Sequence, residues 1–257
     1  MRAITGLTAF NASVSHGNAD DAWALLNLIH DAHPATRQQV VWLLDPETFA
    51  GRGGADPALF SSQFTARFAR SGYRDARGET AAQQTARQAR TPAFRACLVR
   101  TNSFTRYRAD GYRSHDYHDR NRAAGETQAE AIRATVDEYR AIYRDRYRAL
   151  DAQLERRFDQ TIRLANGWGV RPIVVLAPMH PSFVAALAPY GYAQRSGQVV
   201  AFLRAAARRE SFGLLDARSL GVFASTPTDF FDGVHLHASA MHRLLAWVLR
   251  HSPLPHT

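Results

Sequence analysis

The chain has 257 residues, enough for one large domain with a sizeable core, and its 46% hydrophobic content is typical of a globular protein. No apolar run approaches the roughly 20 residues that cross a bilayer, and the single cysteine, Cys97, excludes an internal disulfide framework and a cysteine-rich zinc site. The net charge is +9, but all 32 basic residues are arginines spread among acidic residues, so we expect no specific nucleic-acid partner.

The first predicted elements are a strand, a helix and a second strand. Residues 7–11 are expected to form a short strand or the end of one. Asn18 and the acidic residues after it supply the cap and first turn of a helix that ends before Pro34. Residues 40–44 are a continuous apolar run, which predicts a strand buried on both faces of a parallel sheet and ending at Asp45.

An irregular stretch at about 49–125 is interpreted as an insertion or cap within a single domain that spans residues 1–257. Part of it, positions 115–119, carries two histidines and two aspartates, which could suggest a metal site. No helical or strand pattern aims these side chains at a common point. We therefore interpret them as a solvated loop and expect no metal there.

The second half of the chain is strongly periodic. Apolar residues recur every three or four positions over 126–165, which predicts one long helix, or two with a bend, ending at Asn166-Gly167. The elements expected after it are a strand at 172–178, a helix at 198–209, a strand at 212–216 and a final helix over 244–249.

This alternation of strands and helices predicts an α/β fold with a doubly wound, mostly parallel sheet and helices on both faces. In such sheets, functional groups gather beyond the carboxyl ends of the strands. Asp45, His180 and the loop that holds Asp232 all fall at such ends. We therefore take Asp45 and His180 as residues that line the site.

The loop before the last helix reads Asp232-Gly233-Val234-His235. An aspartate three residues before a histidine can orient the imidazole and stabilise its protonated form, while the other ring nitrogen serves a nucleophile. Asp232 and His235 are therefore the predicted catalytic pair. The alternative is an Asx turn that caps the helix. The neighbouring His237 and His242 are expected on the surface.

The Asp-x-x-His motif resembles the last block of the SGNH (GDSL-like) hydrolase family, in which this pair supplies the Asp and His of a Ser-His-Asp triad. Residues 10–18 resemble the family's second block, and residues 172–181 resemble the strand before the cap in envelope-associated members. The resemblance implies that an amide of Gly17 contributes to an oxyanion hole. Ser13 and Asn18 are further candidates for lining that region.

The chain departs from the family pattern in two blocks. The first block, a strand ending in Gly-Asp-Ser or Gly-x-Ser, has no place, because only about ten residues precede Asn11. Leu44-Asp45-Pro46 stands where a Gly-x-Asn-Asp block is expected. Two explanations are open: Met1 is not the true start and the nucleophile is cut off, or the chain is a degenerate member of the family. We favour the first, because a sheet without that strand exposes two unpaired edges. Ser13 and Ser15 are alternative nucleophiles.

The resemblance implies hydrolysis of small acyl esters or acetylated carbohydrates without a metal or other cofactor, provided that the full gene product supplies a serine. The alternative is a non-catalytic carbohydrate- or envelope-binding module that retains the fold. As it stands the chain reads as cytoplasmic, whereas an upstream signal would make it exported or envelope-associated. The oligomeric state does not follow from the sequence.

Overall fold

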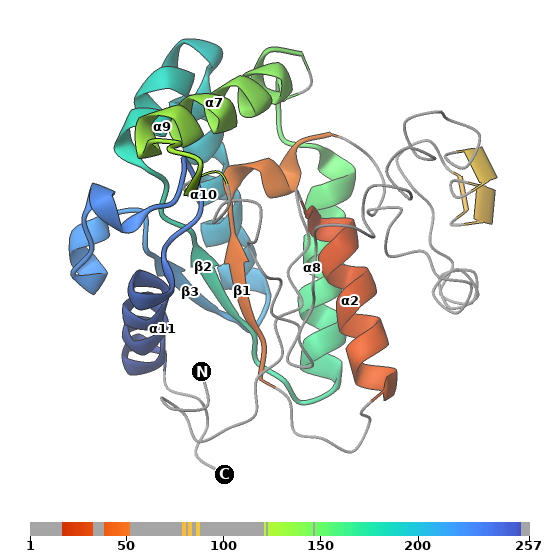
Figure 1. Ribbon diagram of the computed structural model, residues 1–257. Coiled ribbons are helices and arrows are strands. Elements are labelled where there is room, and N and C mark those ends of the chain that lie inside the picture. Colours follow the sequence, from red (N-terminus) through yellow and green to blue (C-terminus); the bar gives the residue numbers. More distant parts are fainter. Residues whose placement is uncertain are drawn as a thin grey trace.

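The computed structural model contains a three-stranded parallel sheet with helices around it (Figure 1). The strands β1 (Val41–Leu44), β2 (Ile173–Leu176) and β3 (Gly213–Asp216) lie in that order across the sheet. Leu44 pairs with Leu176, and Leu176 pairs with Asp216, so the three strands end at the same level. The structure describes residues 17–32, 39–51, 79–80, 82–83, 86–87, 121, 123–145 and 147–252.

Helices account for most of the described residues. None of those in the described segments is long and apolar enough to cross a membrane. The α-helices are α2 (Ala19–Ala32), α7 (Gln128–Asp145), α8 (Ala152–Gly167), α9 (Pro181–Leu187), α10 (Tyr192–Arg209) and α11 (Ala238–His251). The short 3-10 helices are η1 (Pro46–Phe49), η3 (Ala188–Tyr190), η4 (Leu220–Phe223) and η5 (Pro227–Asp229).

Helices pack on both faces of the sheet, because successive side chains of a strand point to opposite sides. Val174 and Leu176 of β2 pack into a core with residues of α2, α8 and α10. Ile173 and Val175, the alternate residues of the same strand, pack with residues of α11. The described part of the chain is therefore an α/β arrangement with a buried parallel sheet at its centre.

A third core lies beyond the carboxyl ends of the strands, under α7, α9 and the start of α10 (Figure 1). Its centre is aromatic: the ring of Tyr139 on α7 meets that of Phe183 on α9 edge-on, at 5.1 Å between centroids. Tyr143 packs on Tyr192 of α10 in a tilted arrangement, at 5.5 Å between centroids. Aromatic pairs in these geometries add about 0.5–1.5 kcal/mol beyond the area they bury.

The helical stripe predicted over 126–165 forms two helices, α7 and α8, that lie on different cores. They separate at a turn where the Tyr147 hydroxyl donates to the carbonyl of Pro46 and the Asp151 side chain accepts from the amides of Gln153 and Leu154. The second contact caps α8. The alternative of two helices is therefore the one observed.

The predicted strands at 40–44, 172–178 and 212–216 are confirmed with shorter bounds. β2 is buried at every residue, as expected for a strand covered on both faces. The prediction that 40–44 is equally buried is wrong for three of the four residues of β1, since only Leu44 is buried. The reason is position: among the described strands, β1 pairs with β2 alone and forms an edge.

Two further predictions fall on parts of the chain that the structure does not describe. These are the strand at 7–11 and most of the insertion at 49–125, including the histidines and aspartates at 115–119.

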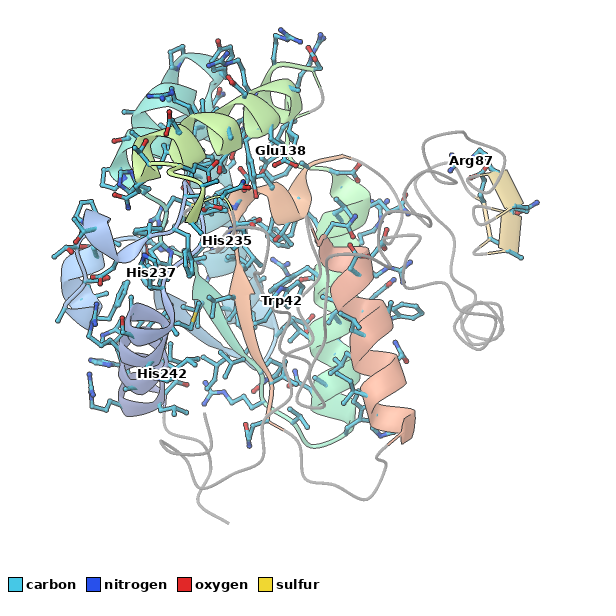
Figure 2. The ribbon with its side chains drawn as sticks, viewed as in Figure 1. Trp42, Arg87, Glu138, His235, His237 and His242 are labelled. Atoms are coloured by element: carbon cyan, nitrogen blue, oxygen red, sulfur yellow. The ribbon has the colours of Figure 1, made fainter. Side chains whose placement is uncertain are left out.

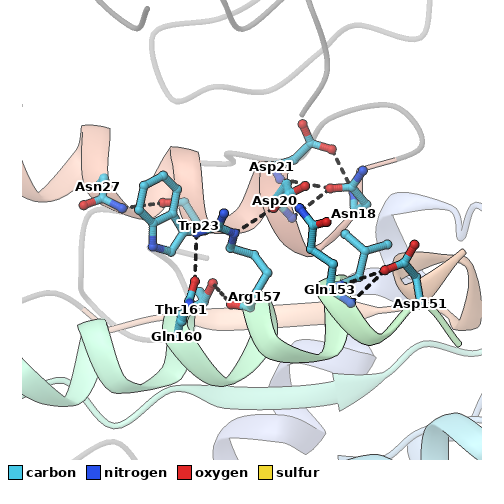
Figure 3. A network of polar contacts seen from close by, with 11 residues as sticks. Asn18, Asp20, Asp21, Trp23, Asn27, Asp151, Gln153, Arg157, Gln160 and Thr161 are labelled. Carbon is cyan, nitrogen blue, oxygen red and sulfur yellow. Dashed lines mark hydrogen bonds and ion pairs between the residues drawn. The ribbon is translucent and has the colours of Figure 1, made fainter. Parts of the chain in front are cut away.

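A buried ion pair joins α2 to α8 (Figure 3). Nε of Arg157 lies 2.7 Å from Oδ1 of Asp20, whose side chain has no exposure to solvent. The Arg157 guanidinium also lies over the ring of Trp23, 4.6 Å from its centroid, where the electron-rich face attracts a cation. Asp20 lies in the first turn of α2 and Arg157 in the second turn of α8, so the pair holds the two helix starts together.

Removing one partner of this pair should destabilise the protein strongly. Asp20→Asn leaves the Arg157 charge, only 12% exposed, without its compensating carboxylate, and such a loss costs about 3–5 kcal/mol. We expect a fall of about 3 kcal/mol in the free energy of unfolding, measured in urea. Asp137→Asn is the control, since it breaks an exposed pair with Arg140 and should barely move the midpoint. Equal small effects in both variants would contradict the assignment of Asp20 and Arg157 as a buried ion pair that stabilises the fold.

Candidate functional site

The Asp232–His235 segment forms the tip of a closed loop between η5 and α11. Phe230 and Leu236 form an antiparallel bridge across its base. The amide of Phe231 donates to the carbonyl of His235 at 2.8 Å, which closes the loop one residue further in. Figure 2 shows His235 between the carboxyl end of the sheet and α7. The loop therefore presents the pair where functional groups of parallel sheets gather.

The carboxylate of Asp232 uses both oxygens. Oδ1 accepts from the amides of Val234 and His235, at 2.8 and 2.9 Å. Oδ2 lies 2.8 Å from Nδ1 of the His235 ring. The predicted Asx turn and the predicted Asp–His contact are therefore both present, each made by a different oxygen of one side chain.

Burial and charge act in opposite directions on Asp232. Burial alone raises the pKa of Asp232, because a carboxylate loses solvation, but the hydrogen bond and charge of His235 and the two loop amides bring this pKa below its ordinary value. Asp232 is thus an anion at neutral pH. With Asp232 at Nδ1, the imidazole is oriented with Nε2 pointing away from the carboxylate, and the His235 side chain is 53% exposed. This is the arrangement of a general base with its orienting acid.

The start of α9 holds the other side of the loop. The amide of His180 donates to the carbonyl of Gly233 at 3.0 Å. The ring of Phe183 lies so close to the Cα of Gly233 that an added Cβ would stand 2.5 Å from Cδ2 of that ring. Glycine is required at position 233 by this close approach, and a larger residue forces the loop and α9 apart.

The remaining candidates have structural contacts of their own at the same end of the sheet. Asp45 follows β1 and caps η1, accepting from the amide of Thr48 at 3.1 Å. His180 follows β2 and caps α9, since its Nδ1 accepts from the amide of Ser182 at 3.1 Å. Burial lowers the pKa of His180, which fits a neutral ring with Nδ1 as an acceptor. The structure thus brings Asp45, His180 and the Asp232 loop to one edge, as predicted.

Asn18 is the cap of α2. Its Oδ1 accepts from the amides of Asp20 and Asp21, while its own amide donates to Asp21 at 2.8 Å (Figure 3). Gly17, immediately before it, is half-buried. Ser13 and Ser15 lie outside the described residues, so their distance from His235 is not defined.

Of the two histidines expected on the surface, His242 is exposed and His237 is only partly so. His242 is exposed on α11 (Figure 2). His237 is half-buried against the ring of Phe231, at 3.9 Å between centroids. Within the described ranges, no three His, Cys, Asp or Glu side chains are grouped so that they could hold a metal ion.

The sequence reading missed Glu47, which lies two residues after Asp45 in η1. Both of its carboxyl oxygens are buried, and the tyrosine Tyr143 from α7 lies beside it. The signal that could have pointed to it is the placement of an acidic residue directly after the end of an apolar strand, inside a stretch that also packs with tyrosines.

Comparisons of this chain with family models, with curated proteins and with solved structures found no match. The candidate site therefore rests on its own geometry.

The contact between Gly233 and Phe183 can be tested by adding a single methyl group. Gly233→Ala places Cβ within 2.5 Å of the Phe183 ring, and such overpacking costs about 1–3 kcal/mol of unfolding free energy. Gly197→Ala is the matched control, because nothing lies within 4 Å of its added Cβ and it sits inside α10. The control should be neutral or stabilise by up to about 1 kcal/mol. Thermal or urea unfolding separates the two, and a harmless Gly233→Ala would disprove the close packing.

The Asp232–His235 contact makes a second prediction at this site. In His235→Ala, burial of Asp232 is no longer offset by the imidazole, so the pKa of Asp232 should rise. A carboxyl group whose pKa is lowered in the folded protein stabilises the fold above its unfolded pKa of 3.8, and this stability is lost as pH falls through the lowered pKa. The variant should therefore lose stability at a higher pH than the parent. Carboxyl ¹³C NMR titration measures the shift. An unchanged Asp232 midpoint would show that the two side chains do not interact.

Proposed function

We propose that this protein is an acyl-ester hydrolase of the SGNH type, with Asp232 and His235 as the acid and base of its catalytic triad. The observation that carries the proposal is the contact of Asp232 Oδ2 with His235 Nδ1 at 2.8 Å. A buried carboxylate holds the ring by one nitrogen, while the side chain of His235 is 53% exposed at the carboxyl edge of the sheet. Small acyl esters or acetylated carbohydrates are the proposed substrates.

The chemistry needs a serine hydroxyl next to Nε2 of His235. The hydroxyl oxygen attacks the acyl carbon as its proton passes to Nε2, and Asp232 stabilises the imidazolium that results. His235 then returns the proton to the leaving alcohol oxygen, which leaves an acyl-serine. A water molecule, deprotonated by His235, attacks this ester and releases the acid. The amide of Gly17, which precedes the start of α2, is the proposed oxyanion donor.

The proposed fold is the doubly wound sheet of this family. α8 and α10, which follow β1 and β2, pack on the same face, as right-handed crossovers in one direction across the sheet require. α11 covers the opposite face. A right-handed crossover through α2, which packs beside α8, puts any strand that precedes α2 on the outer side of β1.

Hydrolysis of p-nitrophenyl acetate tests the proposal directly. The protein should be expressed from its full reading frame, including in-frame codons upstream of Met1, so that a nucleophile encoded there is present. We expect turnover, and His235→Ala should reduce kcat by about 10³-fold or more, because the base acts only in the chemical steps.

His242→Ala is the control for this assay, because His242 is exposed on α11 and should leave the rate unchanged. A folded parent protein without turnover, or equal rates for parent and His235→Ala, would reject the hydrolase assignment. The non-catalytic carbohydrate-binding alternative would then be preferred.

A further inference from the structure

Glu47 is a half-buried residue whose two carboxyl oxygens are buried, and the proposed reaction does not use it. It lies in η1, directly beyond the carboxyl end of β1. Neither Oε1 nor Oε2 has solvent contact, and neither has a hydrogen-bond partner within the part of the chain that the structure describes. The hydroxyl of Tyr143, from α7, is buried in the same way. Buried polar atoms without partners are rare in folded proteins, so each needs a physical explanation.

Among the described residues, no positive charge is found to shift the pKa of Glu47. Burial raises the pKa of Glu47 well above its ordinary value, and the neighbouring negative charge of Asp45 raises it further. The arginines that act on the neighbouring tyrosines are engaged elsewhere: Arg195 Nε donates to the carbonyl of Tyr147 at 2.8 Å, and Arg218 is paired with Asp216 at 2.6 Å.

α8 and α10 pack on η1, and α9 packs on the tyrosines beside it through Phe183. α8 meets η1 through Leu154 and Phe158, and its one nearby acid, Asp151, accepts from its own helix amides. The other titratable groups facing Glu47 are Asp45 of the same turn, Tyr139 and Tyr143 of α7, Tyr147 of the turn after α7, and Tyr192 of α10.

We propose that Glu47 is held as a neutral carboxylic acid and that this neutral form keeps α7 packed over the carboxyl end of the sheet. Ionisation of Glu47 then admits water and loosens the packing of α7. A neutral acid fits a space lined by phenol rings, whereas an unpaired carboxylate there must recruit water or move. The elements that would have to move are η1, which carries Glu47, and α7, which carries Tyr143 beside it.

The packing of α7 affects the loop that holds Asp232 and His235 through a continuous line of contacts. Tyr139, one turn before Tyr143, packs edge-on against Phe183. Phe183 in turn lies against Gly233, between Asp232 and Val234. After burial, which is the largest cause, the negative charge of Asp45 and, more weakly, that of Asp232 raise the pKa of Tyr139. Glu47 is therefore a positioning residue for the loop. This positioning role rests on the proposed function, whereas the claim that the folded protein retains a proton on Glu47 does not.

Stability measured against pH, in the parent and in Glu47→Gln, tests the bound proton. A group whose folded pKa is raised favours the fold below its unfolded value, 4.5 for Glu47, and that stability is lost as pH rises toward the folded value. One proton retained only by the folded state makes the parent's folding constant fall about tenfold per pH unit relative to Glu47→Gln, whose amide cannot ionise. The ratio of the two folding constants should level off at the pH where Glu47 ionises in the folded protein.

Glu138→Gln is the matched control, because Glu138 is an exposed glutamate on α7 and its removal changes the net charge equally. It should follow the parent. The link to the loop is read from the His235 ring signals by NMR: the parent should show an extra transition at the pH where the stability ratio levels off, and Glu47→Gln should lack it.

Parallel stability profiles of the parent and Glu47→Gln would overturn the proposal, because no proton is then held. A stability difference without the extra His235 transition would overturn the positioning role. Neither readout needs turnover, so both stand even if the hydrolase assignment fails. Tyr143→Phe gives an independent variant: it removes the hydroxyl whose interaction lowers the pKa of Glu47, so the pH at which the ratio of folding constants levels off should move upward.

Discussion

The Asp232 carboxylate is the group on which the candidate site depends, because one side chain both shapes the loop and orients the base. Oδ1 accepts from two amides of its own loop, and Oδ2 contacts the His235 ring. A buried carboxylate without these three donors would be strongly unfavourable. Turn formation and catalytic orientation are alternatives for such a pair in the sequence, but here one carboxylate does both, with a different oxygen for each.

The rest of the fold supplies a rigid backing for that arrangement. β2 is buried along its length, and its carboxyl end leads directly to α9. The amide of His180, the last residue of that connection, donates to the carbonyl of Gly233, and the Phe183 ring packs against Gly233. Sites placed on the ends of buried strands are more precise than sites on free loops. An exposed histidine can therefore be well oriented although half of its surface meets solvent.

Local patterns predicted the parts of the site that depend on local contacts. The spacing of Asp232 and His235 is enough, because the contacts that join them span three residues. The apolar runs at β1, β2 and β3 likewise predicted where strand ends would meet. Sequence could not show that α7 folds over this edge, that Phe183 excludes any side chain at Gly233, or that Glu47 is sealed among tyrosines. Those contacts join segments about 50 to 140 residues apart, and no periodicity records them. The half-burial of β1 was missed for the same reason, since an apolar run does not say which strands flank it.

The most direct measurement of the central claim is labelling with a fluorophosphonate probe, followed by peptide mass spectrometry. The probe phosphonylates a serine that a histidine base has activated, with loss of fluoride. The account predicts that the protein expressed from its full reading frame carries the label on one serine, and that the labelling rate collapses in His235→Ala. A folded protein that takes no label, or one labelled equally fast without His235, would contradict the assignment of Asp232 and His235 as a catalytic pair.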